Sequence, residues 1–252
     1  MFHFLFSNQQ RSRKTSTSTS SANRSMANGA MANRAMANPA AASANPDSNM
    51  DAAVRPHFAM VCVNNVNRSP AAHAQLKAAG LRASSYGAGR CVSFPGRTSS
   101  AVRSFQFLTP YELMARILRG EDAPLFAQNG VLTLLARNAA LKRAPERWQS
   151  LSNKQLLAVD VVVCLDYAVF LTVLEDIRMR LRLSFKPKRL HVICLETEDT
   201  PEDAETGSKR ALALCQELDA PPEQLTEARV QAAVQRFEQQ HGVDMFYLGI
   251  HF

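Results

Sequence analysis

From about residue 56 onward, short apolar runs alternate with longer stretches of helical periodicity. The apolar runs, which we expect to be strands, are 57–62, 82–86, 159–164 and 189–195, with a final edge strand at 245–250. The expected helices are 69–79, 109–119, 124–137, 166–182, 203–218 and 222–240. Strands that alternate with helices are typical of a parallel sheet covered by helices on both faces. The sequence therefore predicts one three-layer α/β domain at 56–252, with a mostly parallel, twisted sheet.

Residues 1–50 have a different character. Serine and threonine alternate at 15–21, and a five-residue repeat built on Met-Ala-Asn follows at 26–38. Such a segment has little that could bury a core, so we predict a disordered, low-complexity tail. The apolar opening at 1–6, with acid-free Arg- and Ser-rich sequence behind it, has some features of an organelle transit peptide. A dispensable tail is the preferred interpretation.

The composition argues against several classes of protein. No run of about 18 apolar residues is present, so no membrane-spanning helix is expected. The five cysteines are scattered, without a disulfide framework or metal-ligand spacing, which fits a reducing cytosolic or nuclear compartment. Of the net charge of +7, the first 50 residues carry five basic side chains against one aspartate, which is +4. The remainder therefore has only a small positive excess, and we expect no direct contact with nucleic acid.

The strongest functional signal is a cysteine followed by five spacers, an arginine and a serine. Cys62 and Arg68 are separated by Val63, Asn64, Asn65, Val66 and Asn67, and Ser69 follows. The motif lies between an expected strand and an expected helix whose first position suits Pro70. A loop of this length can curl round one phosphate with its N–H groups facing inward, at a helix N-terminus. Residues 63–69 are therefore the predicted phosphate-binding loop, with no metal required.

The residue types in this loop fit nucleophilic attack on phosphorus. Helix N-termini and neighbouring arginines favour thiolate over thiol, so Cys62 is the candidate nucleophile. The planar fork of Arg68 can hold two phosphate oxygens, and the Ser69 hydroxyl can donate to the thiolate.

The spacers are expected to be structural. Asn65 and Asn67 tolerate the left-handed backbone geometry that a tight loop requires. Val63 and Val66 carry no chemistry and are expected to pack beneath the loop.

Cleavage of a phosphate ester also needs an acid that protonates the leaving oxygen. The apolar run 190–195 ends in an acidic loop, again at the carboxyl end of an expected strand. Asp199 is the preferred acid, and Glu196 and Glu198 remain alternatives. Other polar side chains near the motifs are expected to have capping, solvated or packing roles: Asp160, Asp166, Asp203 and His73.

Together these features resemble a known family. The loop with Pro70 is similar to that of the low-molecular-weight tyrosine phosphatases. Longer blocks resemble more specifically the eukaryotic RNA polymerase II C-terminal-domain serine phosphatases: Asn67-Arg68-Ser69 with Ala72-His73, Tyr86-Gly87-Ala88-Gly89, Val92 with Phe94-Pro95-Gly96, Tyr111-Glu112-Leu113-Met114, Leu125-Phe126-Ala127-Gln128-Asn129-Gly130-Val131-Leu132 and Ala144-Pro145-Glu146-Arg147-Trp148-Gln149. The likeness covers about 56–252.

The resemblance implies a low-molecular-weight-phosphatase-like core with extra helices and a cofactor-free phosphocysteine mechanism. It implies Cys62 as nucleophile, Arg68 as phosphate clamp and Asp199 as general acid. The implied substrate is phosphoserine in the fifth place of the polymerase tail heptad, before a cis proline. The implied partner is a scaffold of the mRNA 3′-end cleavage and polyadenylation machinery. We therefore expect a nuclear protein, with which a cytoplasmic pool is compatible.

Two alternatives stay open. Pro70 is shared with tyrosine phosphatases and motivates a tyrosine or small-molecule phosphatase of the same fold. Segments 90–93 and 164–170 depart from the family near the expected peptide groove. They motivate a phosphopeptide-binding scaffold with little turnover.

Overall fold

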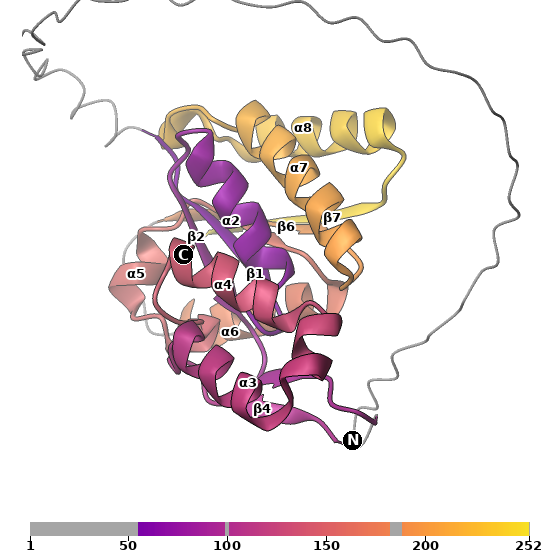
Figure 1. The fold of residues 1–252 in the computed structure, drawn as a ribbon. Coiled ribbons are helices and arrows are strands. Elements are labelled where there is room, and N and C mark those ends of the chain that lie inside the picture. Colours follow the sequence, from indigo (N-terminus) through magenta and orange to yellow (C-terminus); the bar gives the residue numbers. More distant parts are fainter. Residues whose placement is uncertain (1–54, 99–100, 182–187, 252) are drawn as a thin grey trace, which may run out of the picture. The chain divides into compact units, whose positions relative to one another are not determined.

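A five-stranded sheet with the order β2-β1-β5-β6-β7 forms the centre of the described domain (Figure 1). The computed structural model describes residues 55–98, 101–181 and 188–251; the tail predicted at 1–50 lies outside them. The strands are β1 (Phe58–Cys62), β2 (Ala83–Gly87), β5 (Val161–Cys164), β6 (Arg189–Leu195) and β7 (Met245–His251). The first four are parallel, and β7 is antiparallel to β6 at one edge. The predicted strands are confirmed, with small shifts at their ends.

Helices cover both faces of this sheet. They are α2 (Arg68–Ala78), α3 (Tyr111–Gln128), α4 (Val131–Leu141), α5 (Asn153–Leu157), α6 (Tyr167–Leu181), α7 (Pro201–Glu217) and α8 (Glu227–His241), with 3₁₀ turns at Trp148–Ser150 and Pro222–Gln224. Every residue of β1 and β5 is buried, because successive side chains point to opposite faces and both faces are covered. The predicted three-layer α/β fold is confirmed.

Of these helices, α2, α5, α6, α7 and α8 pack in two apolar layers, one on each face of the sheet. One layer joins Phe58 and Met60 of the sheet to α2, α7 and α8. The other joins Ala59 and Val61 to α5 and α6. Among the described residues, no helix has the length and apolar character needed to cross a membrane.

A third apolar cluster lies outside these layers. It is built by α3 and α4, which lie side by side, and by a two-stranded antiparallel sheet of β3 (Val92–Phe94) and β4 (Arg103–Phe105) (Figure 1). The sequence pattern did not predict this hairpin, because its strands have only three residues each. Val66 belongs to the same cluster, so this part of the molecule packs against the predicted phosphate loop.

Two expected helices are divided differently in the structure. The break expected between 109–119 and 124–137 is present, because Asp122 within α3 has non-helical backbone angles (φ −162°, ψ 76°), and its side chain accepts a hydrogen bond from the Leu125 amide. The prediction of one continuous helix over 124–137 is wrong, since α3 ends at Gln128. The chain then breaks at Gly130, which has a φ of 77° that favours glycine, before α4 begins. The stretch 222–240 is likewise a 3₁₀ turn followed by α8, which Thr226 caps.

Candidate active site

The loop predicted to bind phosphate connects a central strand to a helix. Strand β1 ends at Cys62 and α2 begins at Arg68. The expected start at Ser69 is therefore one residue late, and Pro70 is the third helical residue rather than the first. Pro70 is still in the first turn, where helical amides have no intrahelical acceptor. The sulfur thus lies at the carboxyl edge of the parallel sheet, where ligands of such folds bind.

Cys62 is held by groups of its own loop. Its side chain is buried, with Sγ 3.0 Å from Ser69 Oγ and 3.3 Å from the amide nitrogen of Asn65, which donates to it. The Ser69 hydroxyl donates to the Tyr86 carbonyl at 3.1 Å and accepts a hydrogen bond from Asn65 Nδ2 at 3.0 Å. The contact expected between Ser69 and the sulfur is present.

Two of the three loop asparagines, Asn65 and Asn67, differ in conformation. Asn65 has a φ of 54° and is fully buried, as expected for a residue that tolerates left-handed geometry. The same prediction for Asn67 is wrong, since its φ is −99°. Asn67 is the N-cap residue of α2. Its side-chain amide donates to Asp199 Oδ1 at 3.0 Å and to the Thr200 carbonyl at 3.1 Å.

The remaining spacers fix the loop to its surroundings. Val63 and Val66 pack against the apolar clusters, as expected. Asn64 makes a reciprocal pair with the backbone of Ser93: Nδ2 donates to the Ser93 carbonyl at 3.2 Å, and Oδ1 accepts from the Ser93 amide at 3.3 Å. This pair ties the loop to the β3–β4 hairpin.

Arg68 spans the carboxyl ends of β5 and β6. Its side chain is almost completely buried, and Nη1 donates to the carbonyls of Leu165 at 2.9 Å and Thr197 at 2.8 Å. Burial opposes the charge, but the nearby Cys62, Asp199 and Asp166 outweigh it and raise the pKa of Arg68. Its Nε makes no hydrogen bond to any described residue. The guanidinium is therefore a fixed cation beside the loop.

Two aspartates approach this guanidinium. Asp199 Oδ1 lies 3.4 Å from Arg68 Nε, and Asp166 Oδ2 lies 3.3 Å from Arg68 Nη1. The other oxygen of Asp166 accepts from the amides of Ala168 and Val169 at the start of α6. The capping role expected for Asp166 is therefore present, and the contact with Arg68 is one that the sequence pattern did not reveal.

The other acidic candidates lie further from the chemistry. Glu196 and Glu198 are both exposed, and neither contacts Arg68. Burial, followed by the charge of Asp166, raises the pKa of Glu196. Asp203 lies in the first turn of α7, as expected for a capping role that it shares with its neighbours. The N-cap is Thr200, whose hydroxyl accepts from the Asp203 amide at 3.0 Å and donates to the Asp203 carboxylate at 2.7 Å.

Two further side chains have structural roles. His73 Nδ1 lies 3.1 Å from Ser85 Oγ, and burial lowers its pKa to about 4. It is therefore neutral near pH 7, which agrees with the packing role expected for it. Asp160 is neither solvated nor a helix cap, because it pairs with Lys188 at 2.8 Å and accepts from the His57 amide.

No group of three or more His, Cys, Asp or Glu side chains that could hold a metal ion is present within 55–98, 101–181 and 188–251.

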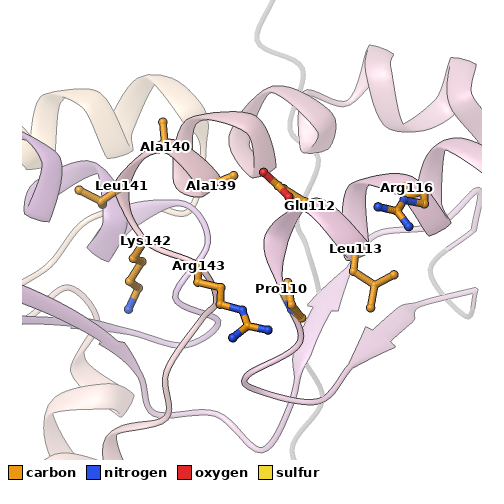
Figure 2. Close-up of a pocket in the computed structure, with 9 residues that line it drawn as sticks. All are labelled: Pro110, Glu112, Leu113, Arg116, Ala139, Ala140, Leu141, Lys142 and Arg143. Atoms are coloured by element: carbon orange, nitrogen blue, oxygen red, sulfur yellow. The ribbon is translucent and has the colours of Figure 1, made fainter.

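A cavity of about 600 Å³ lies away from Cys62, where the first turn of α3 meets the end of α4 (Figure 2). Its lining residues are Pro110, Glu112, Leu113, Arg116, Ala139, Ala140, Leu141, Lys142 and Arg143. Because none of these lining residues belongs to the loop 62–69, the candidate site is the loop at the sheet edge and not this cavity.

Helix α7 packs closely on the segment that positions Arg68. A Cβ at Gly207 would lie 2.4 Å from Thr197 Cγ2, so Thr197 would have to move. We expect Gly207→Ala to destabilise the domain by about 1–3 kcal/mol through this overpacking. Because the Thr197 carbonyl holds Arg68, phosphate affinity should fall as well. Urea unfolding and phosphate titration measure the two effects.

Gly120 is the matched control, because it is also helical and a Cβ there would meet nothing within 4 Å. Gly120→Ala should be neutral or slightly stabilising, since alanine favours helices. Equal stability of the two variants would contradict the close packing at Thr197.

Comparison with known proteins gives a consistent result. A family described as Ssu72-like protein matches residues 56–252. The RNA polymerase II C-terminal domain phosphatase SSU72 of Danio rerio is 37% identical over 164 residues, which are 64% of this chain and 81% of the relative. The SSU72 like protein 5 of Homo sapiens is 37% identical over 158 residues, covering 63% and 78%.

Solved structures agree with these sequence matches. The serine phosphatase of the RNA polymerase II CTD from Drosophila melanogaster superposes with a TM-score of 0.70 at 27% identity, covering 78% of this chain and 99% of that one. A D. melanogaster Ssu72 bound to Symplekin and to a cis peptidomimetic CTD peptide that carries phosphoserine gives 0.69 at 26% identity, covering 77% and 97%.

Proposed function

This chain belongs to the Ssu72 family of RNA polymerase II C-terminal domain phosphatases, and from this premise we propose that it removes phosphate from phosphoserine-proline in the polymerase tail. The observation that carries the proposal is the grouping of Cys62, Arg68 and Asp199 around one loop. The sulfur, the cation and the carboxylate come from β1, α2 and the loop after β6. These are the three groups that a cysteine-dependent phosphoryl transfer needs.

In the first step, the Cys62 thiolate attacks phosphorus in line with the serine oxygen. A sulfur–phosphorus bond forms as the phosphorus–oxygen bond breaks, and the electron pair goes to the serine oxygen. That oxygen takes a proton from Asp199, because an alkoxide is a poor leaving group. Arg68 and the loop amides stabilise the charge on the equatorial phosphate oxygens. The hydroxyl of Ser69, 3.0 Å from Sγ, stabilises the thiolate before attack by turning its proton from the Tyr86 carbonyl to the sulfur.

In the second step, water attacks the phosphorus of the phosphocysteine. Asp199, now a carboxylate, takes a proton from this water as the sulfur–phosphorus bond breaks. The electron pair returns to Cys62, and inorganic phosphate is released. The position of Asp199 supports both roles: its side chain is 33% exposed, so it can exchange protons with solvent, while Arg68 and Asn67 fix its Oδ1.

The substrate and partner assignments come from the relatives. A Drosophila relative that superposes over most of the domain binds a cis phosphoserine peptide together with Symplekin. We extend both kinds of binding partner to this chain. A phosphorylated polymerase tail peptide binds in the active site, and a scaffold of the 3′-end processing machinery binds as partner. A nuclear location follows from that substrate.

Phosphate release from a phosphoserine-proline heptad peptide, compared with a phosphotyrosine peptide of matched length, tests the proposed function. We expect a higher kcat/KM for the phosphoserine peptide. Faster hydrolysis of phosphotyrosine would favour the tyrosine phosphatase alternative. Tight binding of the phosphoserine peptide without turnover, followed by calorimetry, would favour the scaffold alternative.

A further inference from the structure

Three consecutive carbonyl groups of the phosphate loop are bound from outside by α3 and α4. Tyr111 Oη donates to the Asn65 carbonyl at 2.6 Å. Asn138 Nδ2 donates to the Val66 carbonyl at 2.6 Å. Arg137 Nη2 donates to the same Val66 carbonyl at 2.8 Å and to the Asn67 carbonyl at 3.0 Å. The loop is thus held along its outer side by donors that lie 46 to 72 positions away in the sequence.

These bonds determine where the amides of the loop point. In a trans peptide, the N–H of one residue points opposite to the carbonyl of the residue before it. Since the carbonyls of Asn65, Val66 and Asn67 face α3 and α4, the N–H groups of Val66, Asn67 and Arg68 face the other way. The described residues contain no cis peptide bond. Three successive amides are therefore directed to the side on which an anion would sit.

Arg137 is not needed to satisfy either carbonyl that it contacts. The Val66 carbonyl already has Asn138, and the Asn67 carbonyl already accepts the Ala71 amide at 3.2 Å within the first turn of α2. What Arg137 adds is positive charge. Hydrogen bonds from charged donors are stronger, and they polarise the peptide unit so that its N–H becomes a better donor.

The charge of Arg137 is also not used elsewhere. It further donates to the side-chain oxygen of Asn138, at 3.1 Å from Nε and Nη2, and in the described part of the chain no carboxylate pairs with it. Its side chain is half-buried, and burial lowers the pKa of Arg137 while Tyr111 and Cys62 oppose that effect. Partial burial of an arginine without a carboxylate partner costs free energy of folding, because the charge loses hydration. This cost indicates that the charge contributes to function.

We propose that Arg137 is a positioning residue for phosphoryl transfer, acting through the two peptide groups that join Val66, Asn67 and Arg68. Asn138 binds the first of these groups, and Tyr111 fixes the preceding group, between Asn65 and Val66. The inference rests on the proposed function of this loop. Arg68 contacts the phosphate directly, whereas Arg137 strengthens the backbone donors from the carbonyl edge of the same peptide units.

Arg137→Gln tests the charge while both carbonyls keep their other donors. Tungstate is a suitable probe, because it is a tetrahedral dianion whose binding by calorimetry requires no turnover. We expect tungstate affinity and kcat on an aryl phosphate to fall by about tenfold each, with a smaller change in KM. The melting temperature should stay close to that of the wild type. Arg137→Lys restores the charge and should recover part of the affinity.

Arg116→Gln is the matched control. Arg116 carries the same charge, is exposed on α3 and lines the cavity of Figure 2 rather than the loop. Its tungstate affinity and kcat should remain within about twofold of the wild type, since surface charges at a distance are screened. Unchanged affinity in Arg137→Gln, or an Arg137→Lys variant no better than Arg137→Gln, would overturn the inference.

A measurement on the wild type keeps the inference testable if Arg137→Gln fails to fold. Added tungstate should shift the amide protons of Val66, Asn67 and Arg68 downfield in a two-dimensional NMR spectrum. Constant shifts at these three amides, with changes elsewhere in the loop, would overturn it. If tungstate binds with the expected variant pattern but no phosphate ester is hydrolysed, the proposed function fails, while the role of Arg137 in oxyanion binding by the loop stands.

Discussion

Cys62→Ser is expected to abolish phosphate release while leaving the fold intact. A serine hydroxyl keeps the size of the side chain and can keep the contacts with Ser69 Oγ and the Asn65 amide. It cannot supply a thiolate near neutral pH, so the rate should fall by a factor on the order of 10⁴ or more. Phosphate release in a single turnover and thermal melting measure the two expectations.

Cys91→Ser is the control for this substitution. Cys91 is partly exposed and lies outside the loop, next to Ser93 Oγ at 3.4 Å. It should keep full activity. Turnover of Cys62→Ser within a few-fold of the wild type would remove Cys62 as the nucleophile. Vanadate should inhibit the wild type, and inhibition by EDTA would instead indicate a metal-dependent mechanism.

Asp199→Asn should slow hydrolysis of a phosphoserine peptide by about 10²–10⁴-fold and that of an aryl phosphate far less. A serine alkoxide needs a proton to leave, whereas a nitrophenolate leaves almost unaided. Parallel assays of kcat on the two substrates give the ratio that identifies a general acid.

The neighbouring carboxylates provide the comparison. Glu196→Gln and Glu198→Gln should have small effects, because neither side chain contacts Arg68. Asp166→Asn should slow both substrates alike, because Asp166 acts on the clamp that both use. A selective loss on the peptide in Asp166→Asn, with a mild Asp199→Asn, would move the acid to Asp166.

The sheet and the centre of the site could be predicted because their signals are local. Most strands are short apolar runs bounded by polar or turn residues, although β2 contains Ser84 and Ser85. Cys62, Arg68 and Ser69 lie within eight positions of one another. From the residues alone, the general acid could be assigned only to an acidic loop, since no local feature distinguishes Asp199 from Glu196 and Glu198.

What the sequence did not reveal depends on contacts between distant segments. Arg137 is a polar residue in an apolar helical stretch, so it is indistinguishable in sequence from a solvent-facing charge. Asn138 and Tyr111 are fully buried because they bind the loop, a fact that no periodicity encodes. The left-handed residue Gly130, which divides two helices, required a backbone angle that composition alone does not fix.

The groups that hold the phosphate loop come from distant positions in the sequence, and this has a consequence for folding. Residues 62–69 make hydrogen bonds with Tyr86, Arg137, Glu146, Leu165 and Thr197. Most of the described domain therefore helps to fix the conformation of one eight-residue segment. Contacts between such distant positions form only after the intervening chain has been ordered. A partly folded chain would therefore have its strands and helices in place before it could bind an oxyanion. Anion affinity in this protein reports completion of the native state, and an oxyanion in solution stabilises that state alone.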